Sequence, residues 1–189
     1  MTHTLILKAA HFAAQKHRDQ RRKDKHASPY IIHPISVALA IAQIGRVDDP
    51  EILAAALLHD VVEDTEYTLS NIEKMFGETV AKIVDGLTKI SSLKKDKDVS
   101  LQAENFRKML LTLNDDVRVI IIKIADRLHN MQTMDAMRPD KQIKIASETL
   151  YIYAPLAHRI GLYNIKTELE DLGLKYTDPE VYHDILTKI

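Results

Sequence analysis

LLHDVVEDT, residues 57–65, is the most informative segment of the sequence. It places His59, Asp60, Glu63 and Asp64 within an apolar run. Burying an ionised carboxylate or an imidazole without a partner is strongly unfavourable, so these side chains need a compensating group. A cation satisfies them together, and the stretch therefore predicts a metal site.

The spacing of these four side chains fits one helical surface. At about 100° per residue they fall at roughly 0°, 100°, 40° and 140°, which is a single arc. The interpretation is a continuous helix that presents all four on one face. Asp49-Pro50-Glu51 begins this helix, because it supplies a capping acid, a first-turn proline and an acid that complements the helix dipole.

The imidazole in PYIIHP, residues 29–34, offers a third ligand. The metal needs one, because a His-Asp pair alone leaves a transition metal undercoordinated. His33 directly precedes a proline, and residues in that position avoid the helical conformation. We expect a helix to begin at or after Pro34 and to hold His33 at its mouth.

The acid in VIIIKIADRLHNM, residues 119–131, offers a fourth ligand. Asp126 follows a strongly apolar run, where packing by itself does not account for an acid. The β-branched residues from Val117 onward favour a strand, but the length of the pattern favours one buried helix. Asn130 and Thr133 share the helical face of Asp126 and can contact a substrate beside the metal.

Composition favours helices over a turn-rich β fold, since the chain has five glycines, three phenylalanines and no tryptophan. We expect Thr68 or Ser70 to begin one helix, Gly77 to end it, and Asp178-Pro179 to begin a short terminal one. Spacings of three and four residues predict two buried stripes: Leu5, Ala9, Phe12 and Ala13 in the first helix, and Ile35, Leu39 and Ala42 in the second. The polar stretch 91–98 is expected to be a flexible loop whose lysines, Lys94, Lys95 and Lys97, are solvated; the alternative is a phosphate-contacting lid.

These motifs together resemble a known family. His33, His59-Asp60 and Asp126 reproduce the H…HD…D signature of the HD-domain phosphohydrolases. Longer stretches resemble the hydrolase domain of the RelA/SpoT homologues, which remove the 3′-pyrophosphate of the alarmone ppGpp. The stretches are RRKD…PYIIHP at 21–34, AALLHDVVEDT at 55–65, FGETVAKIVDGLTKI at 76–90, IKIADRLHNM at 122–131, and 147–176, which is similar to the segment after the hydrolase core of long members.

The resemblance implies an all-α fold, an HD-domain helical bundle of about ten helices. It implies one domain over residues 1–189, with 147–189 as a helical C-terminal extension. The turn at 24–28 lacks the glycine of long members and resembles the small, hydrolase-only members, whereas 147–176 and the uncapped last helix favour a truncated long member. Nothing in the sequence matches a nucleotidyl-transfer domain, so alarmone synthesis is not expected.

The same resemblance implies the activity and its cofactor. The expected reaction is hydrolysis of ppGpp or pppGpp to GDP or GTP plus pyrophosphate, which ends the stringent response signal. A mixed imidazole and carboxylate set suits Mn²⁺, Fe²⁺ or Zn²⁺, and the resemblance selects one Mn²⁺ per chain. Glu63, aided by Asp64, would position or deprotonate the attacking water.

The resemblance also implies substrate contacts. Arg22 would lie flat on the guanine, which its planar cation favours, and Lys23 would neutralise phosphate charge. Asn130 and Thr133 would hold the ribose and its 5′ side. We assign no chemistry to His3, His11, His17, His26 and His183, and a structural role to His129 and His158.

Three alternatives remain open: removal of the 2′-phosphate of NADPH, another HD-type nucleotide phosphohydrolase or phosphodiesterase, and a helical regulatory module with a degenerate site. The formal net charge of −1 gives no basis for nucleic-acid binding. The chain has no cysteine, no signal-peptide pattern and no apolar run of membrane-spanning length, so we expect a cytoplasmic protein. The oligomeric state is left open.

Overall fold

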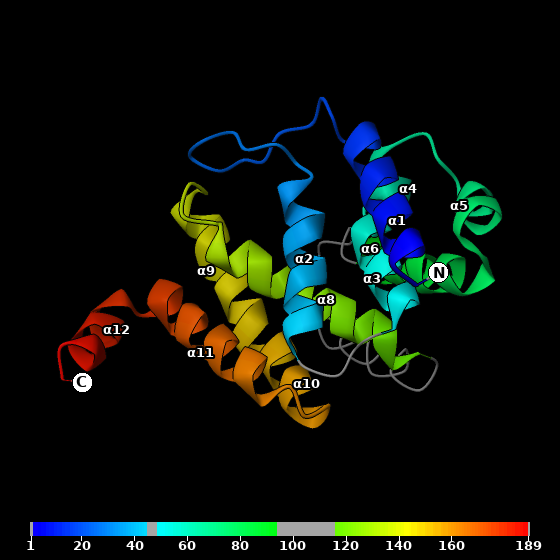
Figure 1. The fold of residues 1–189 in the computed structure, drawn as a ribbon. Helices are drawn as coiled ribbons and strands as arrows, with labels where there is room; N and C mark the ends of the chain where they lie inside the picture. Colours follow the sequence, from blue (N-terminus) through cyan, green and yellow to red (C-terminus); the bar gives the residue numbers. More distant parts are fainter. Residues whose placement is uncertain (1, 45–48, 94–115, 189) are drawn as a thin grey trace. The chain divides into compact units, whose positions relative to one another are not determined.

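The computed structural model of the chain describes residues 2–44, 49–93 and 116–188 (Figure 1). Within these ranges the chain forms helices joined by turns, without a strand, which confirms the predicted all-α class. None of the helices in these ranges is long and apolar enough to cross a membrane.

The chain divides into two compact units. Unit 1 consists of Met1–Gln20 and Pro29–Lys123, and unit 2 of Arg21–Ser28 and Ile124–Ile189. The helices of unit 1 are α1 (Thr2–Lys16), α2 (Ile32–Gln43), α3 (Pro50–Leu58), α4 (Val61–Asp64), α5 (Leu69–Phe76) and α6 (Glu78–Leu93). Helix α8 (Val117–Gln132) begins in unit 1 and ends in unit 2, which also holds α9 (Pro139–Glu148), the π-helix η1 (Thr149–Tyr153), α10 (Ala154–Arg159), α11 (Tyr163–Thr177) and α12 (Pro179–Leu186). The expected organisation, one HD domain over 1–189 with an extension from 147, stays a prediction.

Helix α3 is the central element of unit 1, and it packs against α1, α2 and α6. It is apolar on every side, and a helix of that kind is stable only when it is surrounded. Its beginning is the predicted one: Pro50 occupies the first turn, and the carboxylate of Asp49 accepts a hydrogen bond from the Glu51 N–H at 2.9 Å. The sequence therefore predicted the start of this helix from local chemistry alone.

The predicted continuous helix through residues 57–65 is wrong. Helix α3 ends at Leu58, and His59 and Asp60 form a turn before the short helix α4. The His59 side chain offers the physical reason, since its Nδ1 lies 2.6 Å from the carbonyl oxygen of Ala56. In an unbroken helix that oxygen would accept from the Asp60 N–H, and side-chain bonds of this type compete with helical ones.

Two predictions for helix α2 are also wrong. The helix begins at Ile32, two residues before the expected start, and its first turn tolerates Pro34 because an N–H there has no helical partner. The predicted stripe Ile35, Leu39 and Ala42 is exposed. The buried residues of this helix are His33, Pro34, Val37 and Ile41. Because α2 is apolar on both faces, periodicity could not choose between them.

The first helix agrees better with its prediction, because Ala9, Phe12 and Ala13 are buried, while Leu5 is half-buried. Helix α5 begins after Thr68, one of the two predicted starts, where Thr68 and Asn71 form a capping box. It ends at Gly77, whose φ of 95° is a conformation that favours glycine.

Helix α6 extends to Leu93, so the prediction of a loop from residue 91 is wrong for its first three residues. The rest of that stretch, with Lys94, Lys95 and Lys97, lies outside the described residues. Helix α6 passes close to α8 within unit 1, since a Cβ on Gly86 would meet a methyl of Val119 at 2.8 Å.

In unit 2, α11 packs against α9, η1, α10 and α12 (Figure 1). Helix α8 is joined to α9 by the buried Arg127, which donates to Glu148 at 3.0 Å and lies over the ring of Tyr153 at 4.2 Å. Burial disfavours the cation, but the pKa of Arg127 is nevertheless raised, with Tyr153 and Glu148 among the causes. The end of α8 is therefore held firmly within its own unit.

The π-helix η1 connects α9 to α10 without a break. The Ala154 N–H donates to the carbonyl oxygen of Thr149, five residues back, which makes this turn wider than an α-turn. Pro155 follows in the first turn of α10, and Gly161, with a φ of 81°, follows its end. Asp178 caps α12 through the Val181 N–H, as predicted.

Candidate metal centre and catalytic site

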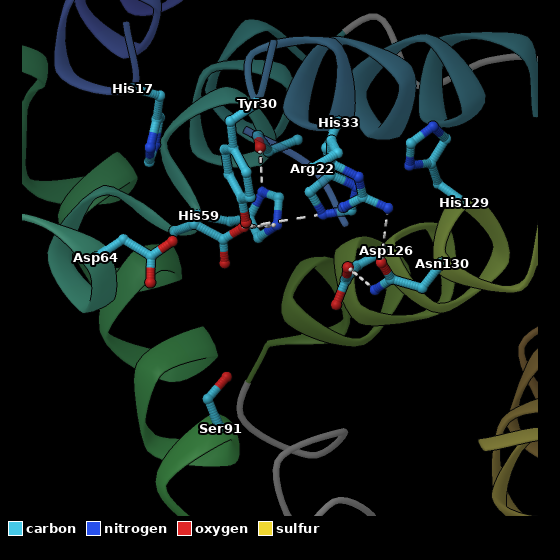
Figure 2. A network of polar contacts seen from close by, with 12 residues as sticks. His17, Arg22, Tyr30, His33, His59, Asp64, Ser91, Asp126, His129 and Asn130 are labelled. Atoms are coloured by element: carbon cyan, nitrogen blue, oxygen red, sulfur yellow. Dashed lines mark hydrogen bonds and ion pairs between the residues drawn. The ribbon is translucent and has the colours of Figure 1, made fainter. Parts of the chain in front are cut away.

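Three of the four predicted metal ligands come together in unit 1. His33 lies in the first turn of α2, and His59 and Asp60 lie in the turn between α3 and α4. Their donor atoms all lie within 4.8 Å of one another. The Nε2 atoms of His59 and His33 are 3.0 Å and 3.8 Å from Oδ2 of Asp60 (Figure 2). Both imidazoles are buried and the carboxylate is half-buried.

The hydrogen bond between His59 and Ala56 orients one ligand for a metal. A carbonyl oxygen can only accept, so Nδ1 of His59 carries the hydrogen and, in the neutral ring, Nε2 presents a lone pair toward Asp60. Metal-ligating histidines are set in the same way, by a second partner that fixes the tautomer. A divalent cation would satisfy the facing lone pairs, and the mixed nitrogen and oxygen donors suit Mn²⁺, Fe²⁺ or Zn²⁺.

Tyr30 supports the same cluster from outside. Its hydroxyl donates to Oδ2 of Asp60, and its ring lies edge-on to His33 at 5.8 Å between centroids. Ligating carboxylates commonly have such hydrogen-bond partners, which orient them. Tyr30 is part of the PYIIHP motif, in which the sequence alone indicated no role for it.

The other predicted site residues form a second cluster, in unit 2. Asn130 donates to Asp126 at 2.7 Å and accepts from the Arg22 guanidinium at 3.3 Å. The same guanidinium nitrogen donates to the hydroxyl of Thr133 at 2.7 Å. Figure 2 shows this chain of contacts from Arg22 through Asn130 to Asp126. Asp126 belongs to unit 2, so its binding to the metal of the unit 1 cluster stays a prediction.

The loop that carries Arg22 is organised by Asp24. Its carboxylate accepts from the backbone N–H groups of His26 at 3.1 Å and Ser28 at 2.9 Å, and the Arg22 N–H donates to the Ser28 carbonyl. The hydrogen bonds from Ser28 hold the pKa of Asp24 below its ordinary value. Lys23 is exposed in this loop, and its phosphate contact stays a prediction.

The two predicted catalytic acids lie on α4, next to the metal cluster in sequence. Glu63 and Asp64 are both exposed. Oδ2 of Asp64 accepts a hydrogen bond of 2.8 Å from the amide of Gln20, which follows α1. Exposure suits a group that must reach a substrate, and their roles stay predictions.

Sequence reasoning missed two further buried polar side chains. His17 is 2% exposed and Lys123 is 5% exposed. Nδ1 of His17 lies 2.6 Å from the Gln20 side-chain oxygen, and Nζ of Lys123 donates to the Ser91 hydroxyl at 2.6 Å. The sequence signal for Lys123 was a cation inside the apolar run before Asp126.

Comparison with known proteins identifies the class. A family model described as an HD domain matches residues 9–163. The chain belongs to the HD-domain family.

The chain is also similar to individual relatives over most of its length. Over 183 residues the chain is 49% identical to the probable guanosine-3′,5′-bis(diphosphate) 3′-pyrophosphohydrolase of Synechocystis sp., covering 97% of this chain and 24% of the relative. It is 49% identical over 173 residues to the bifunctional (p)ppGpp synthase/hydrolase SpoT of Escherichia coli, covering 92% of this chain and 24% of the relative. The chain thus spans about a quarter of the length of these relatives.

A solved structure, described as a metazoan ortholog of SpoT that hydrolyzes ppGpp, has a TM-score of 0.65 and 28% identity to this chain. The match covers 89% of this chain and 93% of that one. These similarities confirm the resemblance to the RelA/SpoT homologues that the motifs indicated.

Proposed function

We propose that the chain hydrolyses the 3′-pyrophosphate of ppGpp and pppGpp, releasing GDP or GTP and pyrophosphate, and so ends an alarmone signal in the cytoplasm. The observation that carries the proposal is the cluster of His33, His59 and Asp60, with the His59 tautomer set for ligation by Ala56. The relatives support the choice of substrate, since their names specify this reaction.

The proposed metal is Mn²⁺, held by His33, His59, Asp60 and Asp126. When bound, it supplies a Lewis acid that polarises phosphoryl oxygen and makes a bound water more acidic. The first three ligands lie on two elements of the same unit, and Tyr30 and Ala56 hold two of them in place. Such second partners keep a donor set ordered for ligation.

The exposed carboxylates of α4 handle the proton. Glu63 accepts a proton from water, and Asp64 assists by orienting that water. The water oxygen attacks the phosphorus bonded to the ribose 3′ oxygen. The bond between that phosphorus and the 3′ oxygen breaks, the 3′ oxygen takes up a proton, and pyrophosphate leaves intact.

The unit 2 cluster recognises the nucleoside. Arg22 stacks on guanine, while Asn130 and Thr133 hold the ribose and its 5′ side, and Lys23 contacts phosphate. The hydrogen bonds from Arg22 to Asn130 and Thr133 support this assignment, because they hold the guanidinium plane beside both ribose contacts before substrate arrives. Preformed contacts of this type reduce the entropy lost on binding.

The test is turnover in ¹⁸O-labelled water. The chain is incubated with Mn²⁺ and, separately, ppGpp, pppGpp, the adenine analogue of ppGpp and NADPH, and the products are separated. We expect GDP or GTP with unlabelled 3′ oxygen, pyrophosphate that carries the label, and no reaction after chelation. Faster release of phosphate from NADPH would favour the 2′-phosphatase alternative, and stepwise orthophosphate release would refute the mechanism.

A further inference from the structure

His17 is a buried polar residue that the proposed mechanism does not use. It lies just after α1, and its Nδ1 is 2.6 Å from the side-chain oxygen of Gln20. The amide nitrogen of Gln20 donates to Oδ2 of Asp64 at 2.8 Å. A chain of two hydrogen bonds therefore connects a buried imidazole to an exposed carboxylate that is 44 residues away from Gln20 in sequence.

The donors and acceptors in this chain can be ordered. An ionised carboxylate only accepts, so the NH₂ group of Gln20 must face Asp64 and its oxygen must face His17. That oxygen also only accepts, so Nδ1 of His17 is the donor. The network thus selects the tautomer of His17 with its hydrogen on Nδ1.

The other ring nitrogen supports a specific role for His17. Its Nε2 is buried and has no hydrogen-bond partner among the described residues. Buried polar atoms without partners are uncommon, and an apolar side chain would fill the same space without one. Filling space in the core is therefore a poor explanation for an imidazole at this position. The hydrogen bond of its Nδ1 to Gln20 is a specific one.

A second set of contacts links the ring of His17 to the metal cluster. It packs against the ring of Tyr30 at 4.8 Å between centroids, and the Tyr30 hydroxyl donates to Asp60. One buried side chain therefore braces two groups, Gln20 and Tyr30, that each hold a carboxylate of the candidate site. Figure 2 shows His17, Tyr30 and Asp64 around the same part of unit 1.

We propose that His17 is a positioning residue, which holds Gln20 and through it sets the orientation of the Asp64 carboxylate. The inference rests on the proposed function, because the use of Asp64 in turnover is assigned there. Asp64 lies at the end of a four-residue helix and is exposed, and among the described residues the amide of Gln20 holds its carboxylate by a hydrogen bond. Displacing a catalytic group by about 1 Å can lower a rate by about a hundredfold.

The test compares variants that differ in the Nδ1 donor. His17→Leu and Gln20→Met keep approximate bulk and remove the hydrogen bonds, whereas His17→Asn keeps an N–H donor at the position of Nδ1. With Mn²⁺ and ppGpp, we expect the first two variants to lose kcat by about ten- to a hundredfold with little change in KM. His17→Asn should recover most of the loss. His11→Leu is the matched control, because His11 forms a similar pair with Gln15 on the exposed side of α1.

A double-mutant cycle separates positioning from general destabilisation. Once Asp64→Asn has removed the carboxylate, His17→Leu should cause little further loss of kcat, because the two changes break one chain. The proposal would be overturned if the losses of kcat from His17→Leu and Asp64→Asn multiplied in the double variant. It would also be overturned if His17→Asn were as impaired as His17→Leu.

A further measurement does not require turnover. In ¹⁵N-histidine NMR spectra of the parent chain, His17 should show its hydrogen on Nδ1, and Gln20→Met should alter that signal. An Nε2–H tautomer in the parent would overturn the proposal. A parent chain that shows the Nδ1–H tautomer but does not turn over ppGpp would instead count against the proposed function.

Discussion

The imidazole of His59 donates from Nδ1 to the carbonyl oxygen of Ala56, 2.6 Å away. This one contact explains two features of the site. It occupies the oxygen that would accept from the Asp60 N–H in a continuing helix. Helix α3 accordingly ends at Leu58, the residue before His59. The same contact also turns Nε2 toward Asp60. The break in the helix and the orientation of the ligand therefore have the same cause.

Metal binding should stabilise the parent chain but not a His59→Ala variant. If Mn²⁺ binds the folded state alone, a concentration of 100 Kd should add about 2.7 kcal/mol to the free energy of unfolding. Thermal melts with and without Mn²⁺ measure the change in Tm. His183→Ala, an exposed histidine on α12, controls for nonspecific binding and should behave like the parent. An equal Mn²⁺ effect in His59→Ala would show that the ion binds elsewhere.

Glu63→Gln should keep metal binding and lose turnover. The change preserves shape but removes the proton acceptor, and such a loss typically lowers kcat by about 10²- to 10⁴-fold. Steady-state kinetics with ppGpp and Mn²⁺-dependent melts report the two properties separately. Glu66→Gln, an exposed acid nearby, is the matched control. A kcat in Glu63→Gln equal to that of the parent would show that another group accepts the proton from water.

Arg22→Ala should chiefly raise the KM for guanine nucleotides. Stacking of a cation on an aromatic ring contributes about 0.5–2 kcal/mol, which corresponds to roughly 2- to 30-fold in affinity. Lys25→Ala removes a charge from the same loop and should change KM little. The adenine analogue of ppGpp provides the specificity test, and equal kinetics with both bases in the parent would remove the basis for this role.

Acid should weaken unit 1 through Asp116. Its carboxylate accepts from the Arg118 guanidinium at 2.9 Å, and this side-chain hydrogen bond holds the pKa of Asp116 below its ordinary value of 3.8 despite partial burial. A depressed pKa in the folded state contributes stability above pH 3.8, and that stability is lost as pH falls through the lower folded value.

Two variants check this pH dependence. Asp116→Asn and Arg118→Leu should each lower Tm at neutral pH, and their difference from the parent should shrink as the pH falls below 3.8. The double variant should be little worse than Arg118→Leu alone at neutral pH, because that change already removes the contact with Asp116 together with the hydrogen bond to Asp49. A constant difference in Tm across the pH range would contradict the assignment.

The sequence predicted features that depend on local chemistry. Asp49 and Asp178 cap the helices that they were expected to cap, and Thr68 rather than the alternative Ser70 caps α5, because capping needs only the backbone of the next turn. The pairing of His59 with Asp60 follows from their adjacency, and Asn130 reaches Asp126 because residues four apart on a helix face each other.

Features that depend on tertiary contacts were not predictable. The buried face of α2 depends on which neighbour covers it, and the sequence offered two apolar faces. The hydrogen bond from Gln20 to Asp64 joins segments that are far apart in the chain and leaves no periodic pattern. Residues such as His17 therefore look unremarkable until the fold brings their partners near.

The wide turn of η1 bears on how this chain should be aligned with others. A bond to the fifth residue back encloses one residue more than an ordinary α-turn. Deleting a residue from a regular helix rotates everything that follows by about 100°. Within Thr149–Tyr153 the same deletion would instead restore a regular turn and leave the residues on either side in phase. A gap of one position here, in the middle of an apparently unbroken helix, is accordingly a change that the fold can accommodate.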